Sequence, residues 1–261
     1  MAGTTVTDER LARTLGVYAG MVSRVVDDPE RWLADDGDGE PSGAAGRAVD
    51  AVSRRAFGSV TPASAEWASL PLADRVSWWV SRIGAVAGLA AAAPRFAGAL
   101  ADRVPLQAGL GASASGIAVC AVARENGVQA PAEWVPLLAK VLFDRDLAPD
   151  PAVVPDAGTS EQELTTNADG EPVDDAGGNG GAGPGVLRGA RTLWRLAHTF
   201  RDVEELLGHR PRGGFLARAV AKVPVVGVAG GWLDERGAIH KAADETSRLV
   251  AAGTGPAGAP R

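Results

Sequence analysis

Apolar residues recur every three or four positions in the first part of the chain, which is the spacing of an amphipathic helix. Between residues 7 and 28 this stripe consists of Leu11, Leu15, Tyr18, Val22 and Val25. Thr7 precedes two acidic residues, and a hydroxyl followed by negative charge suits a helix start. The pattern therefore predicts a helix over residues 7–28. Weaker patterns predict a second helix over 44–57 and a short one over 62–70.

Three apolar segments in the middle of the chain end or begin at residues that mark helix boundaries. The segment 72–93 stops before Pro94, the segment 106–127 ends at Gly127, and the segment that begins at Pro131 continues to Phe143. Proline is favoured in the first helical turn and glycine just after the last. No segment alternates apolar and polar residues in the manner of a strand. The chain is therefore predicted to be all-α.

Small residues stand four positions apart within these apolar segments and again near the C-terminus. Residues with this spacing share one face of a helix, where a second backbone can approach closely. The pattern predicts a multi-helix bundle in which Gly/Ala-rich helices pack tightly, and in which the last helix packs on the middle pair. The predicted packing residues are Gly84, Gly88, Ala92, Ala108, Ala112, Gly116, Gly227 and Gly231.

A long acidic stretch interrupts the helical patterns. Residues 148–185 are rich in glycine and proline, and the chain carries eight acidic and no basic residues between 150 and 186. Such low hydrophobicity with uniform charge predicts disorder. The expected organisation is a helical region over 7–147, a disordered acidic linker over 148–185, a second helical region over 186–251 that completes one bundle, and a mobile tail over 252–261.

The charge balance excludes a strongly basic nucleic-acid binder. The net charge is −6, and without the acidic stretch 26 basic residues face 24 acidic ones. Nothing in this balance predicts a nucleic-acid partner. The single cysteine, Cys120, lies in an apolar segment, so no internal disulfide forms and a buried inert thiol is expected.

The motifs tested for chemistry yield no catalytic, cofactor-binding or metal-binding residue. The glycines between Gly178 and Gly183 match a dinucleotide fingerprint in spacing, but they lie in the acidic linker without a preceding strand. Ser113 and Ser115 lack the strand–turn–helix setting of a nucleophile elbow. His240 and Asp244 stand four apart, where a hydrogen bond on a helix surface is a simpler interpretation than a metal site. We expect no cofactor, and an enzyme is the least favoured class.

Two features are candidates for contact with a membrane surface. Residues 104–123 contain no charge and meet the length of a bilayer span, about 20 residues, but their glycine, serine, glutamine and proline content favours a buried helix pair or a shallow membrane hairpin. Tryptophan beside arginine is typical of a lipid interface, and an arginine stripe can meet anionic headgroups. The alternative for the tryptophans is packing in the core, and the alternative for the arginine stripe is a solvated helix face. The candidate contact residues are Trp78, Trp79, Arg82, Arg188, Arg191 and Arg195.

The segment from Pro224 to Gly231 carries a resemblance to a known family. Pro224 opens an apolar helix, and Gly227 and Gly231 follow in a Pro-x-x-Gly-x-x-x-Gly pattern before a charged helix. This arrangement resembles the C-terminal part of EcsC-family proteins. The resemblance implies a helical, membrane-associated bacterial protein without established catalytic residues.

These observations leave three function hypotheses. The first is a non-catalytic accessory or scaffold protein that is peripherally associated with the membrane, with an anionic membrane surface or another helical protein as its partner. The second is a soluble helical protein-interaction module with a regulatory linker, and the third is an enzyme of unknown class. The N-terminal residues do not form a basic stretch followed by an apolar core, so a cytoplasmic location is expected, with the inner face of the cell membrane as the site of any membrane contact. The oligomeric state is left open.

Overall fold

The described part of the chain is helical, without strands, so the all-α prediction is confirmed there. A computed structural model describes residues 2–33, 60–92, 105–165, 189, 192–199 and 227–253. Its helices are α1 (Ala2–Asp27), α2 (Pro29–Leu33), α4 (Leu72–Ala92), α5 (Pro105–Glu125), α6 (Pro131–Phe143), α7 (Ala157–Thr165) and α10 (Gly227–Ala251). Two 3₁₀ turns, η1 (Trp67–Ser69) and η3 (Pro151–Val153), and a helical segment at 192–199 complete them.

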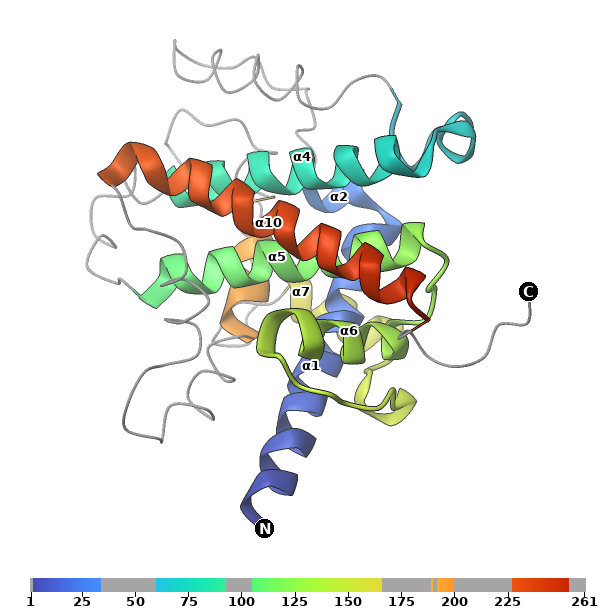
Figure 1. Ribbon diagram of the computed structural model, residues 1–261, viewed down its shortest axis with the longest axis vertical. Coiled ribbons are helices and arrows are strands. Elements are labelled where there is room, and N and C mark those ends of the chain that lie inside the picture. The colour runs from blue at the N-terminus through green and yellow to red at the C-terminus, as the bar shows by residue number, and fades with distance from the viewer. Residues whose placement is uncertain are drawn as a thin grey trace.

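The helices form a bundle around α5. In Figure 1, α4 lies above α5, α10 crosses obliquely in front of them from upper left to lower right, and α1 rises steeply from the N-terminus. α10 packs against both α5 and α4, and α4 packs against α5. α6 packs against α1 and α5, and α7 packs against α1. The contact of the last helix with the middle pair agrees with the packing that the small-residue stripes predict.

The centre of α5 is buried on all sides. Every residue from Ile117 to Ala123 has an exposed fraction of 0%. A helix that is apolar all round is expected at the centre of a core. The lack of charge in this part of α5 is therefore explained by its protein environment. The α1 stripe faces the same core, with Leu15, Tyr18 and Val22 at 0%.

The predicted ends of α5 and α6 are confirmed. Gly127 has a φ of +93°, a conformation that glycine adopts without strain. Its N–H donates to the carbonyl of Arg124 at 2.9 Å, and the N–H of Val128 donates to the carbonyl of Ala123 at 3.0 Å. This pair of bonds is a Schellman motif, which ends α5 and leaves Glu125 in its last turn. α6 then begins at Pro131 as predicted.

Two predicted helices near the N-terminus differ from the structure. α1 begins at Ala2, so Thr7 lies inside the helix and does not cap it. The chain before α4 forms turns and the 3₁₀ turn η1, where an α-helix over 62–70 was predicted. Ser64 explains the turn, because its hydroxyl donates to the carbonyl of Thr61 at 2.7 Å and accepts from the Thr61 N–H at 3.2 Å. The predicted helix over 44–57 lies outside the described residues.

The predicted disordered linker is wrong over its first part. Residues 150–165, which we call the strap, form η3 and α7 and lie against α1. The side chains of Ser160 and Leu164 are 1% and 0% exposed, so α7 buries one side although its composition is polar. The rest of the predicted linker, residues 166–185, and the predicted tail from 254 onward lie outside the described residues.

Acidification is expected to loosen α7 before it affects α5. Asp156 caps α7, because its carboxylate accepts from the backbone N–H of Thr159 at 2.9 Å and from the Thr159 hydroxyl at 3.2 Å. These hydrogen bonds hold the pKa of Asp156 below its ordinary value. Because the folded pKa is the lower one, the stabilisation is complete above the unfolded pKa and is lost as the pH falls through the folded pKa, hence below about pH 4.

Hydrogen exchange followed by NMR checks this pH dependence. The protection of amides 157–165, relative to those of α5, is expected to fall as the pH drops from about 4 to about 2. Asp156→Asn keeps an acceptor oxygen without the titrating charge, and it should flatten this dependence. Protection that stays constant over this range in the unmodified chain would contradict the capping role.

Candidate functional site

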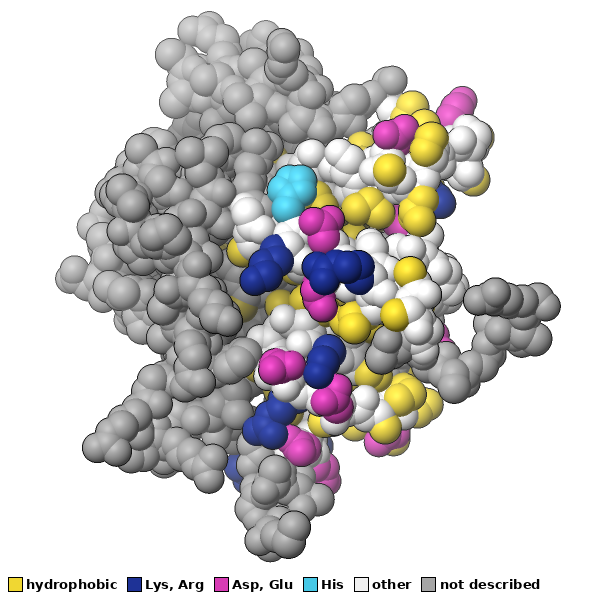
Figure 2. All heavy atoms as spheres, in the orientation of Figure 1, with side chains coloured by type: hydrophobic (Ala, Val, Ile, Leu, Met, Phe, Trp, Pro, Cys, Tyr) yellow, Lys and Arg dark blue, Asp and Glu magenta, His cyan; other side chains and the backbone are white. Residues whose placement is uncertain are grey.

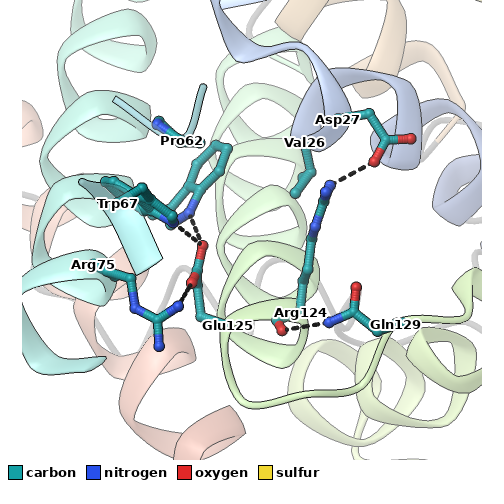
Figure 3. Close-up of a pocket in the computed structure, with 9 residues that line it drawn as sticks. Val26, Asp27, Pro62, Trp67, Arg75, Arg124, Glu125 and Gln129 are labelled. Carbon is teal, nitrogen blue, oxygen red and sulfur yellow. Dashed lines mark hydrogen bonds and ion pairs between the residues drawn. The ribbon is translucent and has the colours of Figure 1, made fainter. Parts of the chain in front are cut away.

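The carboxylate of Glu125, whose side chain is 7% exposed, is held by three side chains. Its Oε1 atom accepts from the indole Nε1 of Trp67 at 3.2 Å and from that of Trp79 at 2.9 Å. Its Oε2 atom pairs with Nη1 of Arg75 at 2.9 Å. Figure 3 shows Trp67 and Arg75 on the same side of Glu125. We call Glu125, Trp67, Trp79 and Arg75 the Glu125 cluster.

The Glu125 cluster joins segments that are far apart in the sequence. Glu125 ends α5, Arg75 and Trp79 lie on the first turns of α4, and Trp67 belongs to η1. A buried carboxylate is tolerated only with an opposite charge and hydrogen bonds to its oxygens. The indole N–H groups of buried tryptophans need acceptors in turn. The same contacts therefore satisfy the carboxylate and fix η1 against α4 and α5.

A second ion pair connects the end of α5 to the end of α1. Nη1 of Arg124 lies 2.6 Å from Oδ1 of Asp27, and Nη2 of Arg24 lies 3.0 Å from the other carboxylate oxygen. The side-chain amide of Gln129 donates to the Arg124 carbonyl at 3.1 Å. In Figure 3, Arg124 points toward Asp27 and away from Glu125. These pairs are about half exposed, so they position the helix ends more than they stabilise the fold.

A pocket of about 210 Å³ lies between the two ion pairs. It opens beside the ends of α1 and α5 and the start of α4 (Figure 3). Its lining residues are Val26, Asp27, Pro62, Trp67, Arg75, Trp79, Arg124, Glu125 and Gln129. The two carboxylates at this pocket are each paired with arginine, so the arrangement favours a structural clamp over an acid–base pair.

The other groups with reactive potential are buried in apolar surroundings. Cys120 is 0% exposed, and burial raises the pKa of its thiol well above the ordinary value. Tyr18 is also 0% exposed; burial raises the pKa of its hydroxyl, which donates to the Ser113 carbonyl at 2.6 Å. Both therefore stay protonated at neutral pH. Among the described residues, no group of three or more His, Cys, Asp and Glu side chains is placed to hold a metal ion.

Trp79 and Arg82, two of the predicted membrane-contact residues, lie inside the bundle. Trp79 is 1% exposed and Arg82 is 3% exposed. Trp78 is half-buried and stacks edge-on between Trp67 and Trp79, with ring centres 5.2 and 5.0 Å apart. The Arg82 guanidinium lies 5.1 Å from the Trp78 ring centre, a cation–π contact. This is the core packing of tryptophan that the sequence leaves as the alternative, except that Arg82 is buried and not solvated.

The predicted arginine stripe is described at one position. Arg195 is half-buried on the helical segment 192–199 and has an interaction partner within the chain. Arg188 and Arg191 lie outside the described residues. A shared arginine face therefore stays a prediction.

The predicted packing residues lie on the helices expected for them. Gly116 and Gly84 are buried, while Gly88 and Ala112 are half-buried. A Cβ atom at Gly116 would lie 2.5 Å from the Tyr18 hydroxyl oxygen, so the tip of this α1 side chain fills the space over Gly116. The backbones of Ala92, Ala108, Gly227 and Gly231 are helical, and their side-chain surroundings are not described.

Sequence reasoning missed two features, each of which left only a partial signal in the sequence. Gly16 and Gly20 stand four apart on α1 and receive the strap, but α1 is less apolar than the segments whose small-residue stripes predict close packing. The Glu125 cluster was missed because its members are 46 or more positions apart from Glu125. The available signal was the need of each tryptophan N–H for an acceptor.

Comparisons with protein-family models, with curated proteins and with solved structures found no match to this chain. None of the described helices is long and apolar enough to cross a membrane.

Proposed function

We propose that the chain is a non-catalytic helical protein that acts by binding another helical protein, as an accessory or scaffold. The observation that carries this proposal is the pairing of Glu125. Its carboxylate accepts hydrogen bonds from two indole N–H groups and forms an ion pair with an arginine, so both of its oxygens are engaged within the fold. A general acid or base must exchange a proton with a substrate within hydrogen-bond reach. A carboxylate engaged in this way serves the fold.

The described surface supports a protein partner. Figure 2 shows basic and acidic side chains interspersed over α10 and α6 on the face in view. Several are paired with each other, such as Arg248 with Glu245 at 2.8 Å and Lys140 with Asp146 at 3.0 Å. Mixed charges of this kind give specificity and orientation to contacts between proteins. A membrane-binding or nucleic-acid-binding surface instead concentrates positive charge.

Peripheral association with the inner face of the membrane is the competing proposal, together with the EcsC-like relationship that suggested it. One of its two candidate contacts consists of Trp78, Trp79 and Arg82, and burial of the last two counts against this contact. Arg188, Arg191 and Arg195 are then the residues that remain to carry it. The membrane proposal therefore makes a specific prediction about this stripe.

Vesicle flotation distinguishes the two proposals. The purified full chain is expected to stay in the soluble fraction with phosphatidylglycerol vesicles and with phosphatidylcholine vesicles, at low and at high salt. The double variant Arg188→Glu/Arg191→Glu should behave identically. Flotation with the anionic vesicles that high salt and this variant both abolish would overturn the proposal in favour of the membrane surface, because headgroup attraction is screened by salt.

Cross-linking in intact cells, followed by purification under denaturing conditions, tests the protein partner directly. One helical protein is expected at constant stoichiometry across preparations, cross-linked to residues of the described surface. The absence of any reproducible partner, combined with turnover of a small molecule, would replace the proposal by an enzymatic function centred on the pocket beside Glu125.

A further inference from the structure

The strap, residues 150–165, lies over two glycines one turn apart on α1. A Cβ atom at Gly20 would stand 2.6 Å from the hydroxyl oxygen of Ser160, and one at Gly16 would stand 2.7 Å from Cγ2 of Val153. Real Cβ atoms are not found at such distances from their neighbours. The strap therefore approaches this face more closely than any residue other than glycine allows. We call Gly16, Gly20 and the α1 surface between them the glycine face.

Few of the described strap side chains are buried. On α7, Leu164 and Ser160 are the buried side chains among those described, while Ala157, Gly158 and Thr159 are exposed. Val153, Val154 and Pro155 are half-buried. The ion pair of Arg31 with Glu161, 2.6 Å long, joins two side chains that are 51% and 40% exposed, so solvent weakens it. The apolar area that the strap buries is small beside that of α5, where every residue from 117 to 123 is inaccessible.

Ser160 opposes this docking. Its side chain is 1% exposed, and its hydroxyl oxygen is buried without a hydrogen-bond partner while it points at Gly20. A hydroxyl in this position loses its hydrogen bonds to water when the strap closes and recovers them when the strap opens. The polar group at the closest contact therefore favours release, and Leu164 favours closure.

We propose that the strap is a releasable clasp, which leaves and reoccupies the glycine face while the bundle of α1, α4, α5, α6 and α10 stays folded. The occupant of the glycine face is thus a segment of the chain itself. Segments with few buried contacts open locally at lower free energy than the core. This equilibrium does not depend on the proposed binding function, because it rests on contacts within one chain.

Native-state hydrogen exchange in low denaturant tests the release. Amides of 157–165 in the unmodified full chain are expected to show protection at least 100-fold below that of α5 amides, with little dependence on denaturant concentration, because local opening exposes little surface. Strap amides that exchange with the same protection and the same denaturant dependence as α5 open only by global unfolding. That result would overturn the proposal.

Glycine-to-alanine variants test the glycine face. Gly20→Ala is expected to lower the protection of amides 157–165 by about 10-fold or more and to leave α5 unchanged, because the new methyl group meets Ser160. Gly237→Ala is the matched control, since a Cβ there meets nothing within 4 Å on α10. It should leave strap protection unaltered. If amides 157–165 showed equal protection in the two variants, the strap would not lie against Gly20, and the proposal would be overturned.

The double variant Gly20→Ala/Ser160→Ala separates a specific contact from general damage. Removal of the Ser160 oxygen removes the atom nearest to the new methyl group, so strap protection should recover toward that of the unmodified chain. Ser160→Ala alone should leave strap protection unchanged or raise it, because it removes an unpaired buried hydroxyl. A strap that Ser160→Ala releases would contradict the role assigned to that hydroxyl.

Discussion

Replacement of Glu125 by alanine is expected to lower the free energy of unfolding by about 2–4 kcal/mol. The change leaves the indole N–H groups of Trp67 and Trp79 without their acceptor, and it leaves Arg75 without its carboxylate. Both indoles are buried, at 8% and 1% exposure, so water reaches them poorly. The Arg75 side chain is 23% exposed and keeps part of its hydration, which places the expected loss below that of a fully buried pair.

Two matched variants separate the parts of this loss. Glu125→Gln keeps an acceptor for the indoles and removes the ion pair, so about half of the loss is expected. Glu9→Ala removes a carboxylate that is 70% exposed in its pair with Arg13, and it should change stability by no more than about 0.5 kcal/mol. Denaturant titration followed by far-UV circular dichroism measures all three. If Glu125→Ala matched Glu9→Ala, the Glu125 cluster would not stabilise the fold.

Elements whose ends are marked in the sequence could be predicted well. α5 ends at Gly127 and α6 starts at Pro131, and these residues end or start helices through their own backbone chemistry. The stripe on α1 was equally clear, because its residues all face one core. The start of α1 was predicted too late, since Thr7 looks like a cap and residues 2–6 carry no apolar periodicity.

The strap could not be predicted from its own composition. α7 contains Ser160 and Leu164 as its described buried residues, and the acidic, glycine-rich sequence around it is typical of disorder. Its order comes from α1, where Gly16 and Gly20 make room for Val153 and Ser160. Information of this kind is distributed between two segments more than 130 positions apart, and neither segment reveals it alone.

The Glu125 cluster illustrates the same limit at the candidate site. Glu125 stands at the end of an alanine-rich helix, where a solvated carboxylate is the ordinary expectation. Its burial follows from η1 folding back over the start of α4, a turn that was predicted as a helix. The tryptophan–arginine pattern that suggested a lipid interface belongs to this same region. Within it, Trp79 and Arg75 contact the buried carboxylate directly.

The second large effect is expected at Gly116, where α5 meets α1. A Cβ atom there would lie 2.5 Å from the Tyr18 hydroxyl oxygen and 2.8 Å from two ring carbons. Tyr18 is fully buried and its hydroxyl donates to the Ser113 carbonyl, so the ring cannot move away without loss of that hydrogen bond. Gly116→Leu is expected to lower the free energy of unfolding by about 3 kcal/mol or more, and Gly116→Ala by about 1–3 kcal/mol.

The sign of the Gly116→Ala effect distinguishes overpacking against Tyr18 from helix propensity. Alanine is favoured over glycine inside a helix by about 1 kcal/mol, so Gly237→Ala, which meets no neighbour within 4 Å on α10, should stabilise the protein. Gly116→Ala makes the same exchange on α5 and should destabilise it, because overpacking against Tyr18 outweighs helix propensity. In a Tyr18→Phe background the nearest atom is gone, so Gly116→Ala should be better tolerated there. Thermal and denaturant unfolding of Gly116→Ala, Gly237→Ala, Tyr18→Phe and Gly116→Ala/Tyr18→Phe tests these expectations. Stabilisation by both Gly116→Ala and Gly237→Ala would mean that the Tyr18 ring does not lie against Gly116.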